Sequence, residues 1–143
     1  MLFSPSRDDV RRFFLDVWQK TQGNAPMSPI ELMAHEWILL HPEYHNLFSD
    51  EDQALTKEFT VENGQTNPFL HLSMHLALEE QLSIDQPHGV REALNRLIDR
   101  SVDRHEAMHL AMQCLGEMLY NAQRHSTTPD TQAYLECLHR QAG

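Results

Sequence analysis

Residues 67–81 predict a helix that carries polar side chains at the centre of its apolar face. Asn67, followed by proline, suits an N-cap, because proline at the first helical position lacks only an N–H that would stay unbonded there. At about 100° per residue, His71, His75 and Glu79 fall within one arc that leucines flank on both sides. Burying two imidazoles and a carboxylate without partners is costly, so we expect something to satisfy them, and a bound cation is one answer.

The rest of the chain also predicts helices, from N-capping residues and from apolar residues at helical spacing. These helices are expected over 6–23, 28–40, 90–98, 103–124 and, as a last short one, from 128–130 onward. Residues 49–66 are acidic and polar, and they predict a long surface loop before the central helix. We find no convincing strand and no internal repeat. The predicted fold is therefore an all-α, single-domain bundle of five to six helices over residues 1–143.

The composition limits the classes of partner. A chain of 143 residues is the usual size of one domain, and its net charge of −10 repels nucleic acids and anionic membranes. The N-terminal residues are too polar for a signal peptide, and no apolar run approaches the roughly 20 residues that span a bilayer. We therefore expect a cytoplasmic protein that binds neither nucleic acid nor membrane. Cys114 and Cys137 lie far apart inside helical patterns, and we expect them to be reduced core residues.

A second pair of histidines repeats the spacing of the first. The chain has ten histidines, a large share for its length, and His105 and His109 are four residues apart in the predicted helix 103–124. Glu117 follows on the same helix. Histidines four apart face the same way and can chelate one metal ion. Two such pairs, each with a carboxylate downstream, resemble in outline the sites where facing helices of a bundle donate ligands.

The predicted metal ligands are the imidazoles and carboxylates of these two helices, together with one histidine from the bend before them. They are His71, His75, His109, His45, His105, Glu79 and Glu117.

Each candidate ligand has a structural alternative. His71 and His75 could be core histidines that bond to carboxylates or backbone carbonyls, and His105 with His109 could line a solvated helix edge. Glu117 could orient a histidine instead of binding the ion, and His45 could be a surface turn residue. His41, which precedes Pro42, could cap the short helical turn at 42–45.

Imidazole ligands favour a divalent transition metal, zinc first, with iron or nickel as alternatives. An open coordination position would let the ion activate water, so a metal-dependent hydrolase or transferase is one expectation, with Glu79 or Glu117 as general base. Its partner would be a small-molecule substrate. The alternative is a non-enzymatic module that binds a protein partner, with structural histidines and no metal. A homodimer is compatible with so many apolar helices, although no sequence feature identifies its interface. Phosphate-binding loops, serine-nucleophile elbows and Cys-x-x-Cys pairs are absent from the sequence.

Several motifs together resemble a known family. They are the run Gly-Gln-Thr-Asn-Pro-Phe-Leu-His at 64–71, the segment His-Pro-Glu-Tyr-His at 41–45, and Cys-Leu-Gly-Glu-Met-Leu at 114–119. The chain is similar over nearly its whole length to a small proteobacterial family of helical proteins catalogued as a domain of unknown function. This resemblance implies a helical, cytoplasmic, single-domain protein, and it implies no particular activity.

Overall fold

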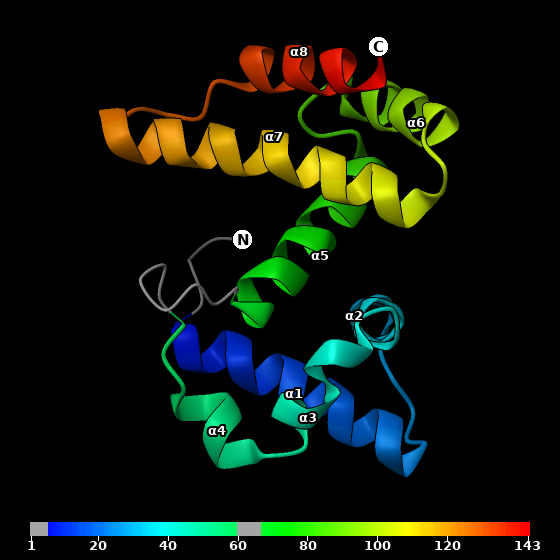
Figure 1. Cartoon of the computed structure of the whole chain (residues 1–143), viewed down its shortest axis with the longest axis vertical. Coiled ribbons are helices and arrows are strands. Elements are labelled where there is room, and N and C mark those ends of the chain that lie inside the picture. Colours follow the sequence, from blue (N-terminus) through cyan, green and yellow to red (C-terminus); the bar gives the residue numbers. More distant parts are fainter. Residues whose placement is uncertain (1–5, 60–66) are drawn as a thin grey trace. The chain divides into compact units, whose positions relative to one another are not determined.

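The fold is all-α, as predicted. The computed structural model describes residues 6–59 and 67–143, and within these ranges it contains helices and no strand (Figure 1). The helices are α1 (Arg7–Gly23), α2 (Pro29–Leu39), the 3₁₀ helix η1 (Pro42–Tyr44), α3 (His45–Phe48), α4 (Glu51–Thr56), α5 (Pro68–Ile84), α6 (Val90–Arg100), α7 (Arg104–His125) and α8 (Thr131–Ala142). These eight α-helices in the described ranges exceed the five to six expected.

The chain divides into two compact units, Met1–Ser73 and Met74–Gly143, and the boundary falls within α5. The single domain expected from the sequence stays a prediction, because each of the two units is described by itself. The predicted start of α5 is confirmed: Asn67 Oδ1 accepts hydrogen bonds from the backbone N–H groups of Phe69 and Leu70, at 3.0 and 3.3 Å.

The core of the first unit lies where α1 packs against α2 and α4. Its buried side chains are aliphatic and aromatic: Phe14, Val17, Trp37, Ile38, Phe48 and Phe69. The capping box predicted at Ser28 is present, since its hydroxyl accepts from the N–H of Glu31 while the Glu31 carboxylate accepts from the N–H of Ser28. Lys20 bonds to the same carboxylate and holds the pKa of Glu31 below its ordinary value.

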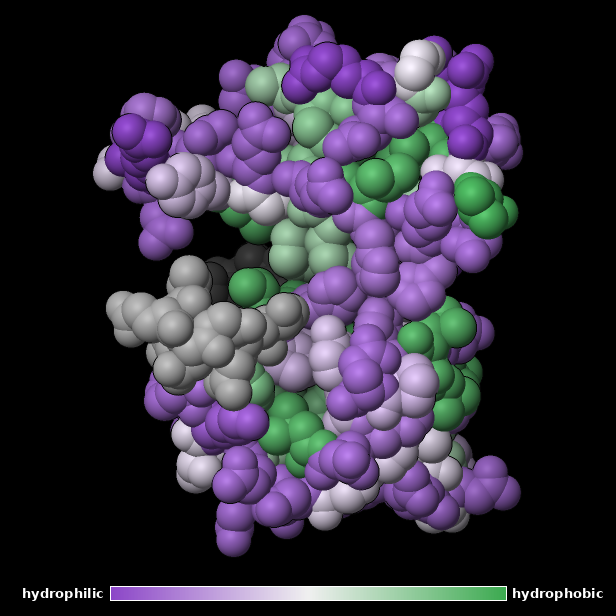
Figure 2. All heavy atoms as spheres, viewed as in Figure 1, coloured by the Kyte–Doolittle hydropathy of each residue, from purple (hydrophilic) through white to green (hydrophobic). Residues whose placement is uncertain are grey.

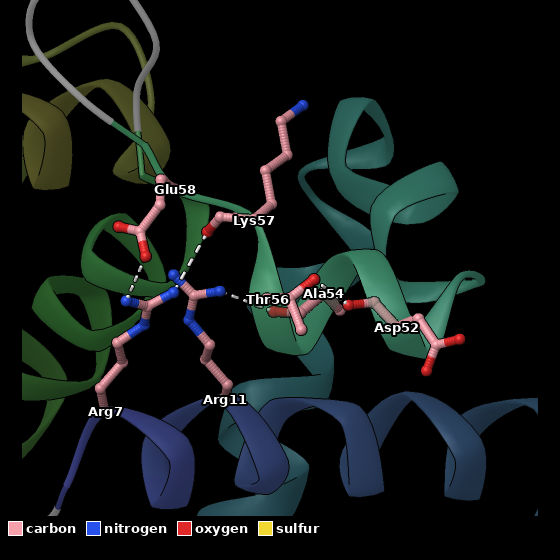
Figure 3. Close-up of polar contacts among 7 residues, drawn as sticks. All are labelled: Arg7, Arg11, Asp52, Ala54, Thr56, Lys57 and Glu58. Atoms are coloured by element: carbon pink, nitrogen blue, oxygen red, sulfur yellow. Dashed lines mark hydrogen bonds and ion pairs between the residues drawn. The ribbon is translucent and has the colours of Figure 1, made fainter.

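One charged side chain is buried in this core. Arg11 is only 3% exposed, and its guanidinium donates a hydrogen bond of 2.9 Å to the backbone carbonyl of Ala54 in α4 (Figure 3). The same guanidinium lies 4.9 Å from the ring centre of Phe69. Burial lowers the pKa of Arg11 from its ordinary value. Beside it, Arg7 forms an exposed ion pair of 2.8 Å with Glu58 (Figure 3).

The predicted long loop at 49–66 is wrong in its first part. Residues 51–56 form α4, because Asp50 acts as N-cap and accepts a hydrogen bond of 3.2 Å from the N–H of Gln53. The next residues, Glu51 and Asp52, place negative charge in the first turn, where it interacts favourably with the helix dipole. The acidic run thus opens a helix. Residues 60–66 of the predicted loop lie outside the described residues.

The second unit comprises the end of α5 together with α6, α7 and α8, and α8 packs against both α6 and α7. The face that α6 buries is the predicted apolar one: Val90, Ala93, Leu94 and Leu97. The expectation of reduced cysteines is wrong, since Cys114 of α7 and Cys137 of α8 form a disulfide with Cα atoms 5.7 Å apart. The antiparallel return of the chain between these helices brings the two cysteines together although they are 23 residues apart.

Most of the surface that Figure 2 shows is hydrophilic, in keeping with the excess of acidic residues. None of the helices within residues 6–59 and 67–143 combines the length and the apolar character needed to cross a membrane.

Candidate metal centre

Three imidazoles meet in the second unit. His75 comes from α5, and His105 with His109 comes from the first two turns of α7. The ring nitrogens that they offer all lie within 4.8 Å of one another. The Nε2 atoms of His105 and His109 are 3.2 Å apart, and the ring centre of His75 lies 5.1 Å from that of His109. We call these three residues the histidine trio.

The local sequence explains why these rings converge. Asp103 caps α7, with Oδ1 accepting a hydrogen bond of 2.7 Å from the N–H of Glu106, so the helix begins just before the histidines. Residues four apart on a helix lie one above the other, and His105 and His109 therefore share a face. His75 is fully buried on α5. Gly116, further along α7, has Met74 of α5 as its neighbour, and a Cβ there would lie 3.6 Å from the methionine methyl.

The spacing within the trio suits metal coordination. Two imidazole nitrogens bound at about 2.05 Å to one tetrahedral ion lie about 3.3 Å apart. The Nε2 atoms of His105 and His109 are already at 3.2 Å. An N–H···N hydrogen bond between the two rings would have a similar length. The arrangement can therefore hold either a proton or a cation between these nitrogens.

Glu79, a predicted ligand and general base, has a partner within the second unit. Arg104 donates a hydrogen bond of 2.8 Å from Nη2 to Oε2 of Glu79, and its Nη1 lies 2.5 Å from Oε1. The paired geometry is the bidentate one that arginine favours with carboxylates. The Glu79 side chain is only 13% exposed, so little water competes for it. Arginine thus occupies both oxygens that would bind a metal ion.

Glu117, another predicted ligand, lies at a different place. It lines a cavity of about 350 Å³ between α7 and α8, whose wall also includes the Cys114–Cys137 disulfide. Eight residues separate it from His109, which corresponds to about 12 Å along the helix axis. Tyr134, buried at the same cavity, has its pKa raised by burial. The structure therefore places Glu117 away from the histidine trio.

The remaining predicted ligands, His45 and His71, belong to the first unit. The His45 ring packs against Trp18 at a tilt of 38°, with ring centres 4.6 Å apart. Its Nε2 donates to the carbonyl oxygen of Ile38, at 2.8 Å. His71 has its Nε2 3.2 Å from Nε2 of His41. Within the first unit, His45 therefore bonds to the backbone, whereas His71 pairs with another histidine.

His41 is the residue that the sequence analysis missed. His41 occupies the N-cap position of η1, as the alternative interpretation allowed, but its side chain makes no capping hydrogen bond and is only 2% exposed. Its Nδ1 donates instead to the carbonyl oxygen of Trp37, at 2.7 Å. The position before Pro42 was a usable signal, since such a residue leaves helical geometry and can turn its side chain back onto the preceding helix.

The chain matches no curated protein. It also matches no solved structure. A family model does match, over residues 6–140, which is nearly the whole chain. The chain therefore belongs to the family described as Domain of unknown function (DUF1841).

Proposed function

We propose that this protein binds a divalent transition metal ion through His75, His105 and His109. The observation that carries the proposal is the convergence of three ring nitrogens, from two helices of the second unit, within 4.8 Å of one another. Imidazoles placed at this spacing can each direct a nitrogen lone pair at a common ion. The burial of His75 supports the proposal, because side chains with polar atoms are seldom fully buried without a role.

The set of donors favours zinc, with iron or nickel as alternatives. Neutral imidazole is a good ligand for all three ions and a poor one for magnesium or calcium. Zinc sites with three protein ligands keep a fourth position for water or substrate, and they are the catalytic ones.

A fourth position of this kind supports a hydrolase or transferase reaction. Zinc lowers the pKa of a bound water to about 7, which makes hydroxide available at neutral pH. In this proposal Glu79 is held by Arg104 and does not bind the ion. The pair would orient the water or an anionic substrate group, since a guanidinium and a carboxylate together offer both donors and acceptors.

The experiment counts metal ions per chain by elemental analysis, in protein purified without a histidine tag and dialysed against ZnCl₂. We expect the His105→Gln and His109→Gln variants each to hold one ion fewer than the parent. The matched control is His88→Gln, whose side chain is 95% exposed in the same unit, and it should hold the parent's number. Circular dichroism checks that every variant is folded.

Parent protein that is folded and free of metal would overturn the proposal, and so would trio variants that keep the parent's number of ions. The first outcome would support the alternative function, a protein-interaction module whose histidines are structural.

A further inference from the structure

A cavity that opens to solvent lies between α7 and α8, within the second unit. Its volume is about 350 Å³, which is enough for a small organic molecule. Both sides contribute residues at helical spacing, three and then four apart: Cys114, Glu117 and Asn121 from α7, and Asp130, Ala133 and Cys137 from α8 and its N-cap. Glu117, Asn121 and Asp130 are exposed, so a solute can enter the cavity from solvent.

One part of the cavity wall is chemically reactive. The Cys114–Cys137 disulfide lines the cavity, with Cys114 only 1% exposed and Cys137 half-buried. In thiol–disulfide exchange a thiolate attacks one sulfur, and the other sulfur leaves with the electron pair of the broken bond. Because access helps to decide which sulfur is attacked, Sγ of Cys137 is the point of attack and Cys114 is the leaving group.

The charges of the wall select the kind of thiol. Glu117 and Asp130 supply two carboxylates, and none of the described residues that line the cavity is a lysine or an arginine. The remaining ionisable side chains of the wall are His125 and Tyr134. A cleft lined by one sign of charge concentrates solutes of the opposite sign. The cavity therefore favours a thiol that carries a positive charge.

We propose that this cavity is a thiol–disulfide exchange site for small cationic thiols, with Cys137 as the residue that forms the mixed disulfide. The attacking sulfur bonds to Sγ of Cys137 while the Cys114–Cys137 bond breaks, and Sγ of Cys114 leaves as a thiolate that takes up a proton. With a dithiol, the second thiolate attacks the small molecule's own sulfur in the mixed disulfide and releases Cys137. Two electrons and two protons pass to the protein disulfide, which becomes two thiols, while the dithiol becomes a cyclic disulfide. The site does not depend on metal binding by the histidine trio.

The first experiment measures how fast dithiols of different charge reduce the oxidised parent protein. The reductants are dithiobutylamine, which is positively charged, dithiothreitol, which is neutral, and dimercaptopropanesulfonate, which is negatively charged. Free thiols are counted by alkylation and mass spectrometry, and each rate is divided by the rate with hydroxyethyl disulfide, which corrects for the reactivity of the reductant itself. We expect the corrected rate of the cationic dithiol to exceed that of the anionic one by about tenfold. A ratio near one would overturn the proposal.

Removing the two carboxylates tests the origin of this preference. In a variant that combines Glu117→Gln with Asp130→Asn, the ratio should fall by about threefold or more, and asparagine preserves the N-cap of α8. The matched control combines Glu92→Gln with Asp99→Asn, two exposed residues of α6 outside the cavity wall, and it loses the same formal charge. The control should keep the ratio of the parent. A ratio that stays unchanged in the cavity variant, or that falls equally in the control, contradicts the assigned selectivity.

Two single-cysteine variants test the point of attack, and both lack the disulfide, so its loss affects them alike. Cys114→Ala keeps Cys137 and should form a mixed disulfide with cystamine, the disulfide of a cationic thiol, as detected by intact mass. Cys137→Ala keeps the buried Cys114 and should react about tenfold more slowly. Equal rates in the two variants would refute the role given to Cys137.

Urea separates exchange in the native state from reduction of unfolded chains. At a site that is open in the native protein, the reduction rate should stay constant in urea concentrations below the unfolding transition. A disulfide that thiols reach only on unfolding is instead reduced faster with each addition of urea. A rate that rises steeply in low urea would show that the cavity does not admit the thiol, and the proposal would fall.

Discussion

Tyr134 of α8 donates a hydrogen bond of 2.5 Å to Oε1 of Gln81 of α5, within the second unit. The tyrosine is 1% exposed, and its burial raises the pKa of the hydroxyl well above the ordinary value of 10.0. The bond ties the last helix of the chain to the helix that carries His75.

Replacing Tyr134 with phenylalanine should lower the free energy of unfolding by about 1 kcal/mol, the net value of a hydrogen bond whose acceptor can regain water. Urea denaturation at pH 7 measures the change. The control is Tyr120→Phe, a tyrosine that is 61% exposed, and it should leave the stability unchanged. An equal loss in both variants would contradict a specific role for the Tyr134 bond.

The Tyr134 hydroxyl should also make the free energy of unfolding depend on pH in the alkaline range. Because the folded pKa of Tyr134 lies above the unfolded value, its stabilisation is fully present below about pH 10 and is lost as the pH rises toward the folded pKa. The free energy of unfolding should therefore fall with pH above about 10. Tyr134→Phe should make this fall shallower without abolishing it, since burial also raises the pKa of Tyr44. Parallel pH profiles for parent and variant would be the contrary result.

In the first unit, Arg11→Met should lower the free energy of unfolding by about 2 kcal/mol. The change keeps an unbranched apolar stem but removes the guanidinium, and with it the hydrogen bond to Ala54 and the contact with the Phe69 ring. The neighbouring Arg12 makes only an exposed ion pair with Glu51, so Arg12→Met should cost less than about 0.5 kcal/mol. Thermal and urea unfolding of the two variants measures both losses of stability. Equal losses would contradict a stabilising role for the buried Arg11 side chain.

The helix starts were predictable because each depends on a few neighbouring residues. Asn67 before a proline and Ser28 three residues before a glutamate supply the N-caps that the structure shows. The acidic run at 50–52 was misinterpreted because the same residues favour solvated loops and first helical turns. Local sequence patterns therefore predicted where helices begin, but they did not distinguish a loop from a short helix at 50–56.

The residues that long-range packing brings together were harder to predict. Helical spacing is enough to pair His105 with His109, but nothing in the sequence states that α7 and α8 return alongside each other and join Cys114 to Cys137. Likewise, His41 meets His71 only because the bend at Pro42 turns the imidazole inward. The spacing of Glu79 from His75 predicted a metal ligand. Its partner in the structure, Arg104, is 25 residues away in the sequence, so local spacing could not reveal the ion pair.

Reducing the Cys114–Cys137 disulfide should destabilise the protein by about 3 kcal/mol, since the bond closes a loop of 23 residues and restricts the unfolded chain. Urea denaturation with and without a phosphine reductant measures this difference. A Cys114→Ala, Cys137→Ala double variant should be insensitive to the reductant and serves as control. Free thiols in the oxidised, folded protein would refute the disulfide directly.

The final prediction concerns which residues bind the metal of the trio. Glu79→Gln should keep the parent's number of ions, because Arg104 already occupies the carboxylate, and Glu117→Gln should keep it because that residue lies about 12 Å along α7 from His109. His105→Gln should lose one ion. A metal bound only by the native state stabilises it by about 2.7 kcal/mol at a hundredfold excess over the Kd. Chelator should therefore lower the Tm of the parent and of both glutamate variants, and should lower it less in His105→Gln. Loss of an ion on Glu79→Gln would instead mean that binding opens the Glu79–Arg104 pair and recruits the carboxylate.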